Sequence, residues 1–147
     1  MDFETVSPAA FGASLRGFGL NILVRDVARE AAFLRCVFGM VTHRVSEDYA
    51  IMGYHGHLIQ LHADHTYGTH PLHALLPESP PRGAGASLHL FESDPDHAAA
   101  RATGAGGRVL HPPANKPHGL RETCILCENG YAWLASRPLS GEERRGT

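Results

Sequence analysis

The sequence predicts an α+β fold built from two consecutive βαβββ modules, and three observations carry this prediction. Each half of the chain opens with an alternating apolar and polar pattern, typical of a strand, that runs into a helical pattern. Further short apolar runs follow each helix. The two expected helix starts, Asp26 and Asp94, are 68 residues apart, as are Gly39 and Gly107. A constant offset across a strand and a helix indicates an internal duplication.

The first module is expected at residues 17–63. In its first strand, Leu20, Ile22 and Val24 point to one face, which predicts a half-buried strand. Asp26 is a suitable N-cap for the helix that follows, because its carboxylate can accept a hydrogen bond from the first turn. Three short apolar runs then predict the remaining strands, at residues 41–45, 50–54 and 58–63.

The second module is expected at residues 85–138. Residues 87–91 alternate like the first strand, and Asp94 with Pro95 predicts a helix that runs to about Gly104. The expected strands are 108–110, 123–127 and 131–136. Residues 64–84, rich in His, Pro and Gly, are expected to link the modules. Residues 1–16 are expected to be a loosely structured lead-in, and 139–147 a tail that is frayed from 141 on.

Composition excludes several classes of function. The 147 residues are 43% hydrophobic and suit one globular domain. Thirteen Lys and Arg residues against 15 Asp and Glu give a net charge of −2 with no basic segment, which argues against a nucleic-acid partner. No apolar run reaches the roughly 18 residues of a membrane span. Three cysteines without a disulfide framework, and no signal-peptide pattern, predict a cytoplasmic protein.

Several segments resemble a known family. Residues 20–27 (Leu-Asn-Ile-Leu-Val-Arg-Asp-Val) and 31–40 resemble the opening of the glyoxalase/bleomycin-resistance/dioxygenase group, the vicinal oxygen chelate (VOC) superfamily. Residues 93–96 open the second helix as in that family, and 127–131 stand where many members have Asp-Pro-Asp-Gly-Asn. The resemblance covers about residues 18–138. It implies curved mixed sheets around a cleft, and a homodimer.

The resemblance also identifies four positions that hold a divalent metal ion in the metal enzymes of the family. They correspond here to Gly19, Gln60, Ser87 and Leu134. Gly and Leu offer no ligand atom, Ser a poor one, and Gln only a neutral amide oxygen. We therefore expect neither the usual metal nor another cofactor.

The same strand periodicity predicts the residues that line the cleft. Side chains two apart in a strand share a face, so the cleft face is expected to carry Asn21, Gln60, His62, Ser87 and His89. No Asp or Glu is expected on this face. Such convergent polar groups in an apolar lining are typical of small-molecule sites. The alternative is that these residues satisfy one another at an interface.

Residues 116–122 are expected to form a proline-stiffened loop beside the cleft. His118 and Arg121 in this loop are candidates to bind an anionic or carbonyl group, Arg121 through its bidentate fork. The alternative is a solvated loop in which Arg121 pairs with Glu122. Cys124 and Cys127 are expected to be buried thiols rather than a metal or redox pair.

The predicted function is binding of a small organic molecule without the usual metal, and no catalytic residue is assigned. The alternative is a lyase, isomerase or dioxygenase that uses a displaced metal or an acid–base pair among His62, His89 and His118. A third possibility is a module whose cleft has closed and which only dimerises.

Overall fold

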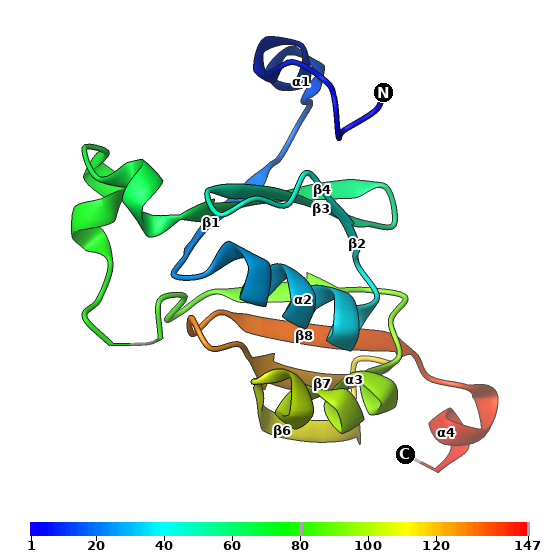
Figure 1. Cartoon of the computed structure of the whole chain (residues 1–147). Helices are drawn as coiled ribbons and strands as arrows, with labels where there is room; N and C mark the ends of the chain where they lie inside the picture. The colour runs from blue at the N-terminus through cyan, green and yellow to red at the C-terminus, as the bar shows by residue number, and fades with distance from the viewer. Residues whose placement is uncertain (80, 147) are drawn as a thin grey trace. The chain divides into compact units, whose positions relative to one another are not determined.

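The computed structural model describes residues 1–79 and 81–146 and contains two four-stranded sheets (Figure 1). The first compact unit takes in Met1–Arg35 and Gly39–Leu76. The second takes in Cys36–Phe38 and the chain from Pro77 onward. Pro80 in the expected linker and Thr147 in the expected tail lie outside the described residues.

The first unit contains a mixed sheet in the order β1-β4-β3-β2. The elements along residues 1–76 are α1 (Pro8–Ser14), β1 (Leu20–Val24), α2 (Val27–Phe38, of which Cys36–Phe38 are assigned to the second unit), β2 (Val41–His43), β3 (Tyr49–Tyr54), β4 (His57–Ala63) and the 3-10 helices η1 (Asp64–Tyr67) and η2 (Pro71–Leu75). Strand β1 runs parallel to β4, and the other pairs are antiparallel. Helices α1 and α2 lie on opposite sides of this sheet (Figure 1).

Helix α2 begins and ends where the sequence predicts. The Asp26 carboxylate accepts a hydrogen bond from the backbone N–H of Arg29 at 3.1 Å, which satisfies a free donor of the first turn. Gly39 has φ 69° and ends the helix in the left-handed region, which a residue without Cβ adopts at little cost. Ile22 of β1 is buried as predicted, and its partner Leu61 in β4 is buried too.

The second unit has the same arrangement, with strand order β5-β8-β7-β6. Its elements are β5 (Ser87–Leu90), α3 (Pro95–Ala102), the 3-10 helix η3 (Thr103–Ala105), β6 (Arg108–Asn115), β7 (Leu120–Leu126), β8 (Ala132–Pro138) and α4 (Gly141–Arg145). Strand β5 is parallel to β8, as β1 is to β4. Two βαβββ modules in an α+β chain are therefore confirmed, with equal strand order and direction.

The duplication is less regular at the end of the second helix. Asp94 is the N-cap and accepts from the backbone N–H of His97 at 3.1 Å, as predicted. However, α3 ends at Ala102, and η3 follows it. The left-handed residue is Gly106, with φ 90°, rather than Gly107. The 68-residue offset thus holds at the helix starts and not at their ends.

Strand β6 is longer than the sequence predicts. The sequence predicts a strand that ends at Leu110, and the prolines at 112 and 113 lack the N–H groups of a regular ladder. The structure continues it to Asn115. It is the outermost strand of its sheet, and its pairing with β7 shifts register between Val109 and His111 and again before Ala114. An outer strand with such irregularities tolerates proline.

The expectations for both ends of the chain are wrong. Within the lead-in, Ser7 caps helix α1 by accepting from the backbone N–H of Ala10, and Pro8 occupies the first turn. Within the tail, Ser140 and Glu143 form a capping box at the start of α4. Arg137 of β8 donates to both Glu143 carboxylate oxygens, at 2.7 and 3.0 Å, and so attaches this helix to the sheet.

Candidate functional site

One face of the first sheet carries the polar residues that the sequence predicts there. In β4, Gln60 and His62 alternate with the buried Ile59 and Leu61, so their side chains share the other face. Asn21 of β1 lies directly opposite Gln60 in the parallel pair. We call the side of the sheet that bears Asn21, Gln60 and His62 the polar face.

Two tyrosines, which sequence reasoning missed, hold these side chains in place. The Tyr49 hydroxyl donates to Gln60 Oε1 at 2.8 Å, which leaves the Gln60 Nε2 donors for other partners. Asn21 Nδ2 donates to the Tyr67 hydroxyl at 2.6 Å. Asn21 Oδ1 is buried and has no hydrogen-bond partner among the described residues. A buried acceptor of this kind is unfavourable unless a ligand or water meets it.

The same tyrosines enclose His62. The His62 ring lies 4.8 Å from the ring of Tyr49 and 5.2 Å from that of Tyr67, both edge-on, and His70 lies 4.8 Å from Tyr67. Burial lowers the pKa of His62 and raises that of Tyr49. Both groups are therefore uncharged at neutral pH, so this end of the polar face offers aromatic rings and neutral hydrogen-bonding groups.

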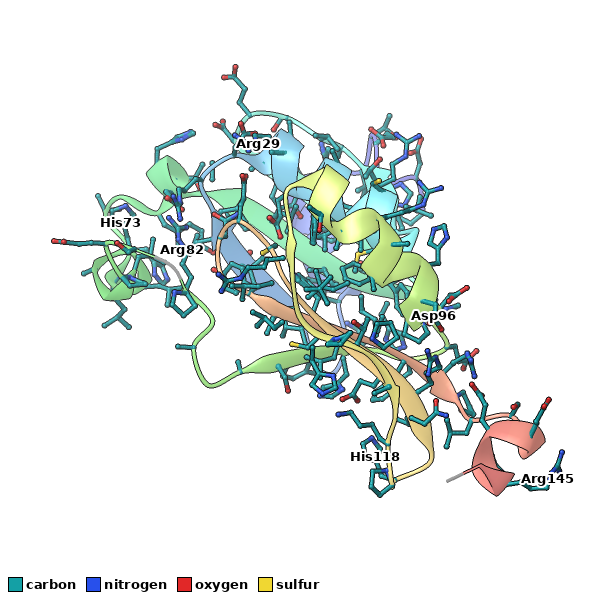
Figure 2. All side chains as sticks on the ribbon, turned by 90° about the horizontal axis from the view of Figure 1, so that it is seen from below. Arg29, His73, Arg82, Asp96, His118 and Arg145 are labelled. Atoms are coloured by element: carbon teal, nitrogen blue, oxygen red, sulfur yellow. The ribbon has the colours of Figure 1, made fainter. Side chains whose placement is uncertain are left out.

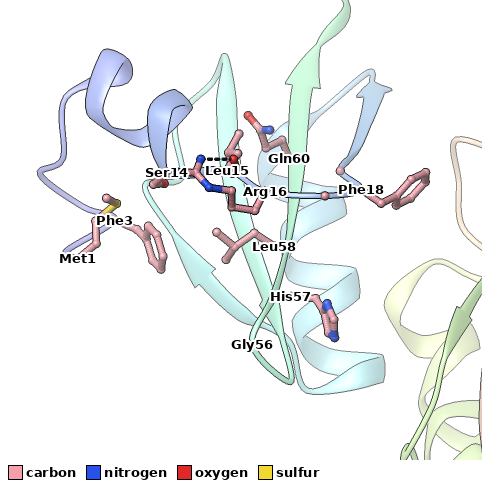
Figure 3. A pocket seen from close by; sticks show the side chains of 12 residues that line it. Met1, Phe3, Ser14, Leu15, Arg16, Phe18, Gly56, His57, Leu58 and Gln60 are labelled. Atoms are coloured by element: carbon pink, nitrogen blue, oxygen red, sulfur yellow. Dashed lines mark hydrogen bonds between the residues drawn. The ribbon is translucent and has the colours of Figure 1, made fainter.

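A pocket of about 540 Å³ adjoins the other end of the polar face. Figure 3 shows its walls: the turn and start of β4 at Gly56–Leu58 with Gln60, and, facing them, Phe3 and the segment Ser14–Gly19. The volume falls in the range of small-molecule sites, roughly 300–1,000 Å³. The part of the chain that we expected to be a loose lead-in therefore forms one wall of the pocket.

Contacts with β2 and the turn after it attach this N-terminal segment to the sheet. The backbone N–H of Arg44 donates to Glu4 Oε1 at 2.8 Å, and Arg44 Nη1 donates to the carbonyl of Val6 at 2.6 Å. The Phe3 ring lies 5.1 Å from His43 and 6.0 Å from Phe11. The pocket wall is thus held by polar and aromatic contacts.

The second unit has a corresponding face on its own sheet. Ser87 Oγ lies 3.0 Å from His89 Nε2, and the His89 ring stacks on Phe91 at 5.7 Å. All three residues are exposed. That these residues line one cleft with Asn21, Gln60 and His62 stays a prediction.

A carboxylate lies on this second face, contrary to expectation. The register pairs His89 with Leu134, Leu134 with Cys124, and Ser136 with Glu122, which places Glu122 on the side of His89. Its side chain is 14% exposed, and Glu122 Oε2 lies 3.8 Å from His118 Nε2. Burial and the Glu122 carboxylate together raise the pKa of the Cys124 thiol. The sequence predicts a loop at residues 116–122, whereas β7 begins at Leu120 and so includes Glu122.

His118 and Arg121 occupy different surroundings. His118 is exposed between β6 and β7 (Figure 2). Arg121 shares its face of β7 with Thr123, which pairs with Ala135, so it lies on the side opposite His89. It donates to both carboxylate oxygens of Asp96 in α3 at 2.8 Å, and to Asn115 at 2.9 Å. A ligand-binding role for Arg121 stays a prediction.

The positions that hold metal in related enzymes do not fit a metal ion here. Gly19 directly precedes β1 and has no side chain, and Leu134 has no donor atom. The Gln60 amide oxygen already accepts from Tyr49. Within residues 1–79 and 81–146, no three His, Cys, Asp or Glu side chains group in a way that would hold a metal. Nor does any helix in these ranges have the length and apolarity to cross a membrane.

Comparison with solved structures supports the fold. A glyoxalase/bleomycin resistance protein/dioxygenase family enzyme from Burkholderia phytofirmans PsJN superposes with a TM-score of 0.66 at 20% identity, over 82% of this chain and 96% of its own. A glyoxalase-related enzyme from Fulvimarina pelagi superposes with a TM-score of 0.66 at 15% identity, over 88% of this chain and 96% of its own. Fosfomycin resistance protein FosX from Mesorhizobium loti superposes with a TM-score of 0.59 at 14% identity, over 89% of this chain and 98% of its own.

Comparison with curated protein sequences finds no match. A family model, in contrast, matches residues 18–134, which span both modules from the start of β1 into β8. The repeated modules, their strand order and this match agree. The chain belongs to the Glyoxalase/Bleomycin resistance protein/Dioxygenase superfamily.

Proposed function

We propose that this protein binds a small organic molecule on the polar face of the first sheet, without a metal at the positions used by the metal enzymes of the superfamily. One observation carries the proposal: Asn21, Gln60 and His62 are held by Tyr49 and Tyr67 beside a pocket of about 540 Å³. Fixed polar groups next to a concavity are how small-molecule sites achieve orientation and specificity.

The chemistry of the polar face supports recognition through hydrogen bonds from uncharged side chains. Asn21 Oδ1 is an acceptor without a partner among the described residues, and Gln60 Nε2 is a donor. A ligand that accepts from Gln60 Nε2 would use the donor that the Tyr49 contact leaves free. No bond to a metal is needed for such recognition.

A fragment screen on isotope-labelled protein tests this proposal. We expect fragments that bind to shift the amide signals of Asn21, Gln60 and His62. The Gln60→Leu variant, which keeps the volume and removes the amide, should weaken these fragments about five- to tenfold, the size of one to two lost hydrogen bonds. Glu47→Gln, an exposed change in the same unit, is the matched control and should leave binding unchanged. Fragments that bind elsewhere only would contradict the proposal.

A second candidate function is acid–base catalysis, as in a lyase or isomerase. The observation in its favour is the His118–Glu122 pair, in which a mostly buried carboxylate lies 3.8 Å from an exposed imidazole. A carboxylate beside a histidine can orient the imidazole ring, and a positioned imidazole is the commonest general base in enzymes. Deuterium exchange at carbon atoms next to carbonyl groups, followed by NMR in D2O, tests this function. Glu122→Gln should abolish any exchange that the wild type shows.

We also propose a cytoplasmic homodimer. The homodimer rests on the family resemblance. The three free cysteines, Cys36, Cys124 and Cys127, fit a reducing compartment. Light scattering coupled to gel filtration gives the mass in solution, and a monomer at micromolar concentration would contradict the dimer.

A further inference from the structure

The pocket beside Gln60 is rich in donors and has no acidic group. Of the residues that line it, Arg16 is the one with a permanently charged side chain, and none is Asp or Glu. His57 also lines it, but as a neighbour of Leu58 in β4 it directs its imidazole to the other face of the strand. A pocket with this balance favours a ligand group that accepts hydrogen bonds and carries negative charge.

Arg16 is held in place and keeps unused donors. Its Nη1 donates to the carbonyls of Ala13 and Leu15, each at 2.8 Å, at the C-terminal end of α1 (Figure 3). These bonds fix the guanidinium at the pocket wall while Nε and Nη2 remain available. Among the described residues, no carboxylate forms an ion pair with Arg16. The most favourable partner for these donors is therefore an anion from outside the chain.

The rest of the lining is apolar. Phe3, Leu15 and Leu58 contribute hydrophobic surface, and Phe18, which is also among the lining residues, is 92% exposed. An exposed phenylalanine beside a concavity gains from covering an apolar ligand, because contact removes its surface from water. On the β4 side, Gln60 Nε2 supplies a second donor.

We propose that the ligand of this pocket is an amphipathic organic acid, whose carboxylate binds Arg16 and Gln60 and whose apolar body contacts Leu58 and Phe18. This inference rests on the proposed function, because it assigns a ligand class to the same region of the first sheet. The 540 Å³ volume accommodates a ring or a short alkyl chain.

Paired probes of equal shape test the inference. Phenylacetate, 3-phenylpropanoate and octanoate are titrated into labelled protein, each beside its uncharged carboxamide. We expect the acids to shift the signals of Arg16, Leu58 and Gln60 and to bind about five- to tenfold more tightly than the amides. This range is that of a charge-assisted hydrogen bond reduced by solvent screening. Raising NaCl from about 50 to about 500 mM should weaken the acids and not the amides.

Variants assign the charge effect to Arg16. Arg16→Gln should remove the preference for the acids, and Arg16→Lys should restore part of it because the charge returns without the planar fork. Arg108→Gln, the same charge change on an exposed residue of the second unit, is the matched control. Circular dichroism checks that α1 persists, and the salt titration of the wild type decides the matter if it does not.

The outcomes separate the two proposals. If acids and amides bind the polar face equally, the ligand class is wrong while the proposed function stands. If neither set shifts any residue of the polar face or the pocket, and the fragment screen also fails there, both are wrong. A preference for acids that persists in Arg16→Gln overturns the assignment to Arg16.

Discussion

The Tyr49 hydroxyl donates to the side-chain carbonyl of Gln60 at 2.8 Å, from a strand position diagonal to it on the same face. This bond decides which end of the Gln60 amide faces the pocket. With Oε1 occupied, Nε2 is the group available to a ligand. The electrostatic character of the site therefore depends on a phenol that does not line the pocket itself.

Tyr49→Phe removes this constraint and keeps the ring. We expect the free energy of unfolding to fall by about 0.5–1.5 kcal/mol, the usual net contribution of one hydrogen bond. The preference of the pocket for acids over amides should also fall, because the Gln60 amide becomes free to turn. Urea unfolding and the paired titrations measure the two effects. Reduced stability with an unchanged preference would show that Tyr49 does not orient Gln60.

The pKa of His62 gives the stability a pH dependence of known sign. Burial lowers this pKa below its usual value of 6.5, so the unfolded chain takes up a proton at His62 at a higher pH than the folded chain. The contribution of a neutral His62 is complete above pH 6.5 and is lost as pH falls through the folded pKa. Urea unfolding between about pH 7.5 and 5 should show that the free energy of unfolding falls less on acidification in His62→Gln than in the wild type. His97→Gln, at an exposed site of α3, serves as the control. Equal losses of stability in wild type and His62→Gln would contradict the assignment.

The Asp96–Arg121 pair joins α3 to β7 and is predicted to stabilise the second unit modestly. The side chains are 51% and 23% exposed, so a double-mutant cycle should give a coupling of about 0.2–1 kcal/mol. Arg121→Lys should lose most of this coupling, because Lys cannot make both 2.8 Å bonds. A coupling near zero would show that the bidentate geometry does not persist in solution.

Glu143 should titrate far below an ordinary glutamate. Hydrogen bonds from Arg137 and then from the Ser140 backbone lower its pKa from 4.5 to about 2. The stabilising effect of the ionised carboxylate on α4 is therefore present above pH 4.5 and disappears as the pH falls towards 2. Carboxyl NMR signals report the titration directly. Arg137→Gln should move the midpoint upward, and faster amide exchange at residues 141–145 should accompany it.

Chelation should not affect ligand binding. Because Gly19 and Leu134 supply no ligands at the positions used by metal enzymes of the superfamily, elemental analysis should find well below one divalent ion per chain. Thermal stability and probe binding should be the same before and after EDTA. Stoichiometric zinc, nickel, manganese or iron that survives dialysis would contradict this expectation.

The sequence predicts those parts of the fold that depend on local chemistry. Asp26 and Asp94 cap their helices, and strand alternation places Asn21, Gln60 and His62 on one face. Two further local signals, the Ser7–Pro8 start of α1 and the capping box of α4, also lie in the sequence. They indicate helices where a loose lead-in and a frayed tail are expected.

Other features of the site could not be predicted from local patterns. Tyr67 accepts a hydrogen bond from Asn21, a residue 46 positions earlier in the chain, after the chain turns back through η1. Nothing in the residues around Tyr67 indicates that partner. The pocket likewise joins Phe3 to Leu58, which only the packing of the N-terminal segment brings together. Contacts of this kind arise from tertiary structure, and the hydrophobic periodicity of the sequence cannot predict them.

The prolines of β6 have a consequence for self-association. An outermost strand presents unpaired N–H and C=O groups, which invite another chain to continue the sheet. Pro112 and Pro113 have no N–H, and because successive N–H groups of a strand point to opposite sides, the free edge of β6 loses a donor here. The register shifts between Val109 and His111 and before Ala114 distort the strand further. This edge of the second sheet is therefore a poor template for edge-to-edge growth into fibrils, although β6 has eight residues.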